Sequence, residues 1–141
     1  NVFRARSKCI SRSSSNYSCD LRQNYLNLYI RSVKLSSALN KAGIKRGDTV
    51  SALLPNTPAM LECHYGVPMS GAILHSINTR LDPAVISFQL NHAESKIMIV
   101  DSEYIALAKE ALKHTKNKPK IIEYDDIEYI GKREKFKSIN Y

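Results

Sequence analysis

Short apolar runs alternate with longer stretches of helical spacing along most of this chain. From about Tyr25 to Ala42, small and apolar residues recur every three or four positions, which predicts an amphipathic helix. Gly43 follows and suits the left-handed position that ends many helices. The stripe consists of Leu28, Ser32, Leu35, Leu39 and Ala42. The basic residues of this helix lie off the stripe and are expected to face solvent: Arg31, Lys34 and Lys41.

The next two predicted strands are each followed by a helix that begins near a proline. Thr49–Leu54 reads as a buried strand closed by Pro55, and Ala72–Ile77 reads as a second short apolar strand. Between them, Asn56 or Thr57 is placed to cap a helix over about Pro58–Ser70, with Met60, Leu61, His64 and Val67 toward one side. Asp82 and Pro83 then open a third helix, which carries Val85, Phe88 and Leu90.

The clearest strand is Lys96–Val100, a continuous apolar run of the kind that is buried on both faces of a parallel sheet. Asp101 or Ser102 caps a fourth helix that runs to about Lys113, and Lys120–Glu123 returns to strand. Strands and helices therefore alternate, with connections that suit parallel crossovers. This pattern predicts an α/β fold, a mostly parallel sheet with flanking helices.

Such open sheets bind ligands beyond the carboxyl ends of their strands. The segments in which chemistry is expected are therefore Pro55–Thr57, Ile77–Arg80 and Asp101–Glu103.

Composition divides the 141 residues into two parts. The chain is 43% hydrophobic and 24% charged, which is typical of a globular protein, and no window approaches the roughly 18 to 20 apolar residues of a membrane-spanning helix. Residues 1–24 form a poorly defined segment rich in Ser and Arg, and residues 25–141 form an incomplete α/β unit that ends in a charged, aromatic tail. Because the chain starts at Asn1 instead of Met and ends without an obvious finishing element, we expect both ends to be cuts in a longer chain.

The net charge of +8 is concentrated at the amino end. Residues 1–47 hold ten Lys and Arg against one acidic residue, Asp20, whereas residues 48–141 hold eleven basic and twelve acidic residues. The charge distribution therefore argues against nucleic-acid binding by the whole fold. An alternative stays open, in which a small basic α/β module uses residues 1–47 to bind nucleic acid or an acidic partner.

Most signatures of catalytic or metal chemistry are missing. The five glycines form no phosphate-binding motif, and no nucleophile elbow is present. The cysteines and histidines share no metal-ligand spacing, and Cys63 and His64, being adjacent on a helix, point about 100° apart and are expected to be ordinary helix residues. From the residues themselves, no catalytic residue and no metal site is predicted. The fold class is the limit of what the pattern establishes.

Several short motifs allow a further inference, because they occur in a characteristic order. These are RGDTV before an apolar strand, then LPNTPAM, VPMSGA, INTRLD and NHAESK. In order and spacing they resemble the early part of the AMP-forming acyl-CoA synthetases, the adenylate-forming ligases. The residues of these motifs are most similar to those of the branch that includes medium-chain acyl-CoA ligases and methylmercaptopropionate-CoA ligase. The resemblance covers about Arg31 to Tyr141, and residues 1–30 depart from the family pattern.

The resemblance implies an ATP-dependent reaction that joins a fatty acid or related carboxylic acid to coenzyme A through an acyl-adenylate. ATP, Mg²⁺ and coenzyme A would serve the full-length enzyme, in the cytoplasm. The Ser/Thr/Gly-rich ATP loop and the catalytic lysine of the family have no counterpart in these residues. The fragment alone is therefore expected to be inactive and to bind none of these molecules tightly. The sequence assigns neither an acyl substrate nor an oligomeric state.

The resemblance implies two basic side chains as candidate binding residues. In related enzymes the loop Ile77-Asn78-Thr79-Arg80 and the start of a later helix approach the nucleotide end of coenzyme A, so Arg80 and Lys109 are candidates for contacts with its phosphates. In the competing interpretation, Arg80 anchors its turn through Asp82, and Lys109 is a solvated helix residue. A third hypothesis concerns folding: a truncated chain whose sheet lacks partner strands would expose apolar edges and aggregate.

Overall fold

The fold was determined as a computed structural model that describes residues 25–124. The expectations for residues 1–24 and for the tail beyond Tyr124 lie outside the described residues. Within them, helices and strands alternate as the sequence predicts, with every boundary within two residues of its expected place. The elements are α1 (Tyr25–Lys41), β1 (Thr49–Leu53), α2 (Pro58–Met69), β2 (Ile73–Ser76), α3 (Pro83–His92), β3 (Ile97–Asp101), η1 (Ser102–Tyr104), α4 (Ile105–Lys113) and β4 (Lys120–Tyr124).

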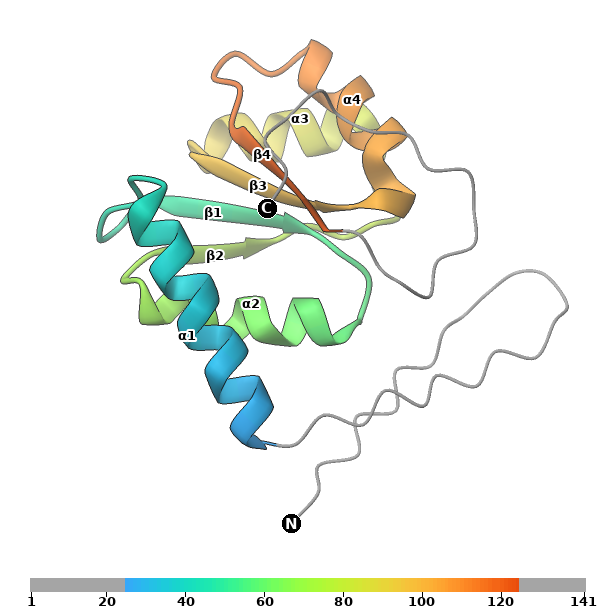
Figure 1. The fold of residues 1–141 in the computed structure, drawn as a ribbon. Helices are drawn as coiled ribbons and strands as arrows, with labels where there is room; N and C mark the ends of the chain where they lie inside the picture. The colour runs from blue at the N-terminus through green and yellow to red at the C-terminus, as the bar shows by residue number, and fades with distance from the viewer. Residues whose placement is uncertain (1–24, 125–141) are drawn as a thin grey trace, which may run out of the picture.

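The four strands form one parallel sheet in the order β2-β1-β3-β4 (Figure 1). Val50 of β1 is paired with Leu74 of β2 on one side and with Ile97 of β3 on the other, and Ile97 is aligned with Lys120 of β4. The chain therefore moves outward from β1 to β2, crosses back over β1 to β3, and continues outward to β4. The predicted α/β class is confirmed.

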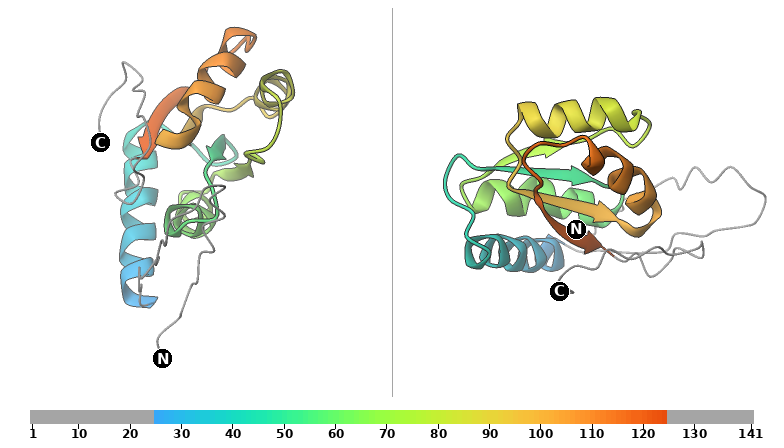
Figure 2. Two further views of the ribbon diagram at one scale, coloured as in Figure 1. Left: turned by 90° about the vertical axis from the view of Figure 1, so that its right-hand side faces the viewer. Right: turned by 90° about the horizontal axis from the view of Figure 1, so that it is seen from above.

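The helices cover the two faces of the sheet in pairs. Figure 2 shows α1 and α2 on one face and α3 and α4 on the other. Successive residues of a strand point to opposite faces, so Ile97 and Ile99 pack under α1 and α2, whereas Met98 and Val100 pack under α3 and α4. All five residues of β3 are buried, which confirms the expectation of a strand covered on both faces.

Local signals set the helix boundaries. Gly43 has φ +94°, the left-handed conformation expected after α1. Thr57 and Asp82 occupy the N-cap positions of α2 and α3, each followed by a proline, but neither side chain accepts a capping hydrogen bond. Asp101 does cap, since its Oδ1 accepts a hydrogen bond from the Glu103 amide at 2.9 Å, and a short turn of 3₁₀ helix, η1, precedes α4.

The buried face of α2 differs from the predicted one. His64 is exposed, and the buried residues are Ala59, Glu62, Cys63, Gly66 and Val67. The reason is that α1 packs against α2 at Gly66, where an added Cβ would lie 2.9 Å from the Ser32 carbonyl oxygen of α1. Gly66 and Glu62 therefore face inward. Neither is a large apolar residue, so the hydrophobic pattern of the sequence does not predict their burial.

Arg31 is also placed differently from the expectation. Its guanidinium forms an ion pair with the buried carboxylate of Glu62, and this hydrogen bond raises the pKa of Arg31. Tyr124 at the end of β4 lies close enough to act electrostatically on the same guanidinium. Arg31 is thus part of the α1–α2 interface, although half of its side chain remains exposed.

The α3 prediction is likewise corrected. Leu90 is buried as expected, but Phe88 and Val85 are exposed, and the other buried positions are Ile86 and Ser87. The Phe88 ring instead stacks on His92 one turn further along the helix, with ring centroids 5.9 Å apart. The buried positions follow the helical repeat from Ile86, so the side-chain size of Phe88 is a misleading guide to the core.

Replacing Arg31 by methionine is expected to lower the free energy of unfolding by about 1 to 3 kcal/mol, the cost of removing a charged hydrogen-bonding partner from a buried carboxylate. Methionine keeps the unbranched aliphatic part of the side chain but removes the guanidinium that pairs with the Glu62 carboxylate. Urea denaturation followed by circular dichroism measures the change. Lys34→Met, on the exposed side of the same helix, is the matched control. An equal effect of the two substitutions would contradict the assigned role of the ion pair.

Candidate binding edge

The carboxyl ends of all four strands lie at one edge of the sheet, because the strands are parallel. The chain leaves β1 toward β2 on one side, whereas β3 lies on the other side of β1. The strand order thus reverses between β1 and β3, and open α/β sheets bind ligands at such a point. The segments that follow β1, β2 and β3 were the expected place for chemistry, and the topology puts all three at this edge.

The loop after β2 is held by its own backbone. The Ile77 amide donates to the Ala52 carbonyl of β1 at 2.9 Å, and the Arg80 amide donates to the Asn78 side-chain oxygen at 2.9 Å. Arg80 itself is exposed. Among residues 25–124, no ion pair joins Arg80 to Asp82, so the alternative in which Arg80 anchors its turn through Asp82 finds no support in the described structure.

The loop after β2 comes close to the segment after β3. Burial raises the pKa of the Tyr104 hydroxyl in η1, Thr79 in the loop after β2 lowers it, and the neighbouring carboxylates of Glu103 and Asp101 raise it further. Thr79 and the Tyr104 hydroxyl are thus near neighbours, and the loops that follow β2 and β3 meet in front of β1. The sequence analysis missed this contact, for which the only local signal was a hydroxyl-bearing residue close to the end of each strand.

Lys109 lies in the second turn of α4 and is half-buried. It is thus further from the edge along the helix axis than the start of α4, where the resemblance implied the contact. Arg80 follows β2, and the start of α4 follows β3 through η1, so both lie at the carboxyl edge of the sheet. Arg80 thus lies at the predicted edge, whereas Lys109 lies further from it, in the second turn of α4.

A second polar cluster crosses the sheet beneath α3. The Ser51 hydroxyl of β1 lies 2.9 Å from Nδ1 of His75 in β2 and 2.6 Å from the hydroxyl of Ser95. Ser51 and Ser95 are buried, and His75 is half-buried. Burial lowers the pKa of His75, which favours the neutral ring. With both serines shielded from solvent, this cluster links β2, β1 and the start of β3 and is not an accessible nucleophile.

Because the pKa of His75 is lower in the folded chain than in the unfolded chain, the unfolded state takes up the proton first as the pH falls. The chain is expected to keep its full stability above about pH 6.5 and to lose stability as the pH falls below it, by less than the one-proton limit of about 1.4 kcal/mol per pH unit because part of the ring meets solvent. Urea denaturation at a series of pH values measures this slope. His75→Asn should flatten it, whereas His114→Asn, at an exposed position, should not. A slope unchanged by His75→Asn would refute the assignment.

Cys63 and His64 behave as the sequence predicts for ordinary helix residues. Cys63 is buried, and burial raises the pKa of its thiol to about 12. His64 is exposed, and its Nδ1 lies 2.8 Å from the Met60 carbonyl oxygen one turn earlier. The thiol and the ring therefore do not form a nucleophile–base pair.

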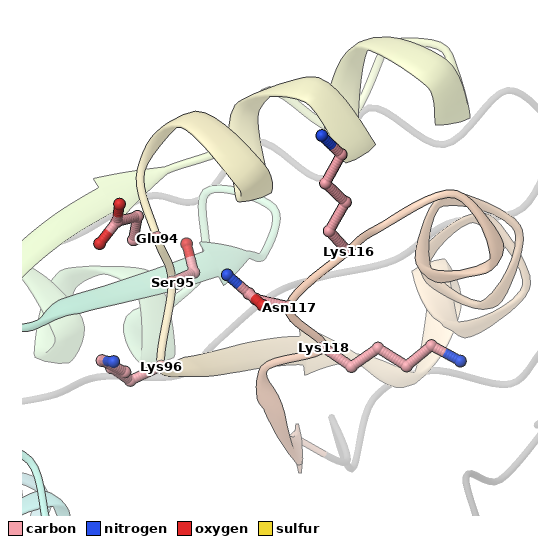
Figure 3. A pocket seen from close by; sticks show the side chains of 6 residues that line it. All are labelled: Glu94, Ser95, Lys96, Lys116, Asn117 and Lys118. Atoms are coloured by element: carbon pink, nitrogen blue, oxygen red, sulfur yellow. The ribbon is translucent and has the colours of Figure 1, made fainter.

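A hollow of about 450 Å³ lies at the opposite, amino edge of the sheet. Figure 3 shows the residues that line it, which precede β3 and β4: Glu94, Ser95, Lys96, Lys116, Asn117 and Lys118. The three lysines are exposed. Ser95, the buried polar side chain of this lining, is already hydrogen-bonded to Ser51, so the exposed lysines alone do not form a built anion site and the hollow is not a candidate binding site.

Comparisons with known proteins agree with this geometry. The family described as AMP-binding enzyme matches residues 12–138. Butyrate–CoA ligase AAE11, a peroxisomal protein of Arabidopsis thaliana, is 39% identical over 131 residues, which is 89% of this chain and 23% of that protein. The peroxisomal trans-cinnamate:CoA ligase of Petunia hybrida is 49% identical over 84 residues, 60% of this chain and 15% of that protein. The chain thus spans less than a quarter of either relative.

Solved structures share the fold. The anthranilate CoA ligase AuaEII in complex with anthranoyl-AMP aligns with a TM-score of 0.72 at 20% identity, covering 77% of this chain and 21% of that one. A Mycobacterium tuberculosis fatty acyl CoA synthetase aligns with a TM-score of 0.67 at 28% identity, covering 74% and 22%. No helix within residues 25–124 is long and apolar enough to cross a membrane.

Proposed function

Because the chain belongs to the AMP-binding enzyme family, we propose that it forms the N-terminal α/β part of an ATP-dependent acid–CoA ligase. In this reaction a carboxylate oxygen attacks the α-phosphate of ATP and releases pyrophosphate. The thiol of coenzyme A then attacks the acyl carbonyl, loses its proton and displaces AMP. The match of the family over residues 12–138 is the observation that carries this proposal.

The residues of this chain do not fit an ATP–Mg²⁺ site by themselves. The sequence has no glycine-rich phosphate loop, and within residues 25–124 no three His, Cys, Asp or Glu side chains gather closely enough to hold a metal ion. Phosphate transfer needs such a loop, a metal ion and a cation close to the developing charge. The proposed contribution of residues 25–124 is therefore to bind and orient coenzyme A at the carboxyl edge, and the chain of 141 residues alone is proposed to be inactive.

Arg80 is the residue that best suits this contribution. It is exposed at the carboxyl edge on a loop fixed by hydrogen bonds, and its planar guanidinium can contact two phosphate oxygens at once. Lys109 is the second proposed contact, reaching from the second turn of α4. Its half-buried position makes it the weaker candidate, because only part of its side chain meets solvent.

The acyl substrate is proposed to be a short aliphatic or an aromatic carboxylic acid, since the relatives are named for butyrate, trans-cinnamate and benzoate. The branch expected from the sequence, which includes medium-chain acyl-CoA ligases, stays a prediction. The cytoplasmic location also stays a prediction, because these three relatives are peroxisomal by name.

The test is to assay the complete gene product that contains this chain for AMP formation that requires both coenzyme A and an acid. Butyrate, octanoate, cinnamate and benzoate form a suitable panel. We expect at least one acid to support coenzyme A-dependent AMP formation, and the isolated 141-residue chain to support none. A complete gene product that forms no AMP with any acid would count against the proposal.

The alternative binding module based on residues 1–47 receives no added support. Arg31, one of its basic residues, is paired with Glu62, and residues 1–24 lie outside the described structure. Binding to nucleic acid that weakens steeply as the salt concentration rises would support this alternative.

A further inference from the structure

Helix α1 carries a second apolar face besides the one that packs in the core. Its buried positions are Ser32, Ser36 and Leu39, whereas four large apolar side chains recur at helical spacing on a different side of the helix and are 41 to 64% exposed. These four residues form the outer face of α1: Leu26, Tyr29, Ile30 and Val33. An exposed apolar face of this kind marks a surface that another segment or a partner covers.

The chain leaves β4 close to α1. Tyr124, the last residue of β4, packs against the core cluster beneath α1 and α2, as does Leu35 of α1. Because α1 leads into the amino end of β1, its first half lies toward the carboxyl edge, where β4 ends (Figure 1). Residues 125–130 continue from this point. In extended form six residues span about 20 Å, whereas the outer face runs about 10 Å along the helix axis.

The sequence of residues 125–130 is complementary to the outer face. It reads DDIEYI, with three acidic and three apolar residues. α1 has no acidic residue, and the exposed Lys34 follows directly after Val33. Charge therefore favours this segment over a second copy of α1, which would bring lysine against lysine. The family match over residues 12–138 includes both α1 and this segment.

We propose that residues 125–130 dock on the outer face of α1, with their apolar side chains on that face and their carboxylates toward Lys34. This contact joins the end of the last described strand to the first helix. It also reduces the apolar surface through which a truncated chain could aggregate. The inference concerns the fold alone, so it stands or falls separately from the proposed ligase function.

The chain contains no tryptophan, so a single introduced tryptophan can report on this face. Tyr29→Trp places it on the outer face. Phe88→Trp is the matched control, because Phe88 is an aromatic residue of similar exposure on α3, 68% against 60%. In the 141-residue chain, acrylamide should quench Tyr29→Trp about two-fold less than Phe88→Trp, since a docked segment covers one side of the ring.

Replacing both Ile127 and Ile130 by serine removes the aliphatic side chains of the segment. This double substitution should raise the quenching of Tyr29→Trp to the level of Phe88→Trp and leave Phe88→Trp unchanged. Equal quenching of the two probes without the serine substitutions would overturn the inference, as would protection of Tyr29→Trp that persists with them. Protection that is lost on dilution would identify a second copy of the chain as the occupant and would equally overturn the proposal.

Urea denaturation gives a second measurement that needs no probe in the outer face. Ile30→Ser should lower the stability of the 141-residue chain, and this loss should disappear once Ile127 and Ile130 are already serine, because the contact is then missing. Ile30→Ser losses that are the same in both backgrounds would contradict the docking.

Discussion

Replacement of Gly66 by valine is expected to lower the free energy of unfolding of the chain by about 3 kcal/mol, at the upper end of the usual cost of overpacking. An added Cβ would lie 2.9 Å from both the Ser32 carbonyl oxygen and Cδ2 of Leu35, and 3.0 Å from Cβ of Leu35. Leu35 can rotate in part, but the Ser32 carbonyl belongs to the backbone of α1. The two helices must therefore move apart, which also strains the Arg31–Glu62 ion pair.

Urea denaturation of the 141-residue chain measures this effect. Tyr65→Val is the matched control, because Tyr65 is the preceding residue of α2 and is half exposed, and valine and tyrosine have similar helix propensities. The control should change the stability by less than about 0.5 kcal/mol. Gly66→Ala should fall between the two, since alanine gains about 1 kcal/mol in helix propensity while it introduces the Cβ clash. A Gly66→Val chain as stable as the control would contradict the close contact between α1 and α2.

Replacement of Arg80 by alanine in the complete gene product is expected to raise KM for coenzyme A about 10-fold or more, with little change in kcat. A hydrogen bond to a charged group contributes roughly 1.5 to 3 kcal/mol, and each 1.4 kcal/mol corresponds to a factor of ten. The exposure of Arg80 favours the lower end of that range. Arg80→Lys should recover part of the loss, since it keeps the charge without the planar fork.

Two controls make this result specific. KM for pantetheine should not respond to Arg80→Ala, because pantetheine lacks the nucleotide phosphates. Lys118→Ala removes an exposed cation from the amino edge of the sheet and should leave KM for coenzyme A unchanged. If Arg80→Ala affected both thiols equally, or if Lys118→Ala had the same effect, the assignment of Arg80 to the phosphates would be wrong.

The elements of this fold could be predicted because their signals are local. The apolar run of β3, the helical stripe of α1 and the prolines at Pro58 and Pro83 each depend on a few consecutive residues. The inward face of α2 could not be predicted in this way. Glu62 and Gly66 are buried only because Arg31 and the backbone of α1 lie opposite them, and both partners are about 30 residues away in sequence.

The candidate site likewise has one part that the sequence predicts and one part that it does not. The edge that would bind a ligand followed from the parallel strands, and Arg80 followed from the family resemblance. The Thr79–Tyr104 contact depends on the strand order, which places the ends of β2 and β3 on either side of β1. A pattern of apolar and polar positions predicts strands but not their order. The closeness of Thr79 and Tyr104 was therefore visible only in the structure.

The two outer strands of the sheet each have one edge without a partner strand among residues 25–124. These strands are β2 and β4, and Ile73 of β2 is 57% exposed. Every strand pairing of this sheet is nevertheless made between consecutive or next-but-one strands within residues 49–124. The pairings of these four strands therefore need no strand from outside these residues. The outer edges of β2 and β4 carry backbone N–H and C=O groups that can pair with a further strand, whether from this protein or from a second copy of it.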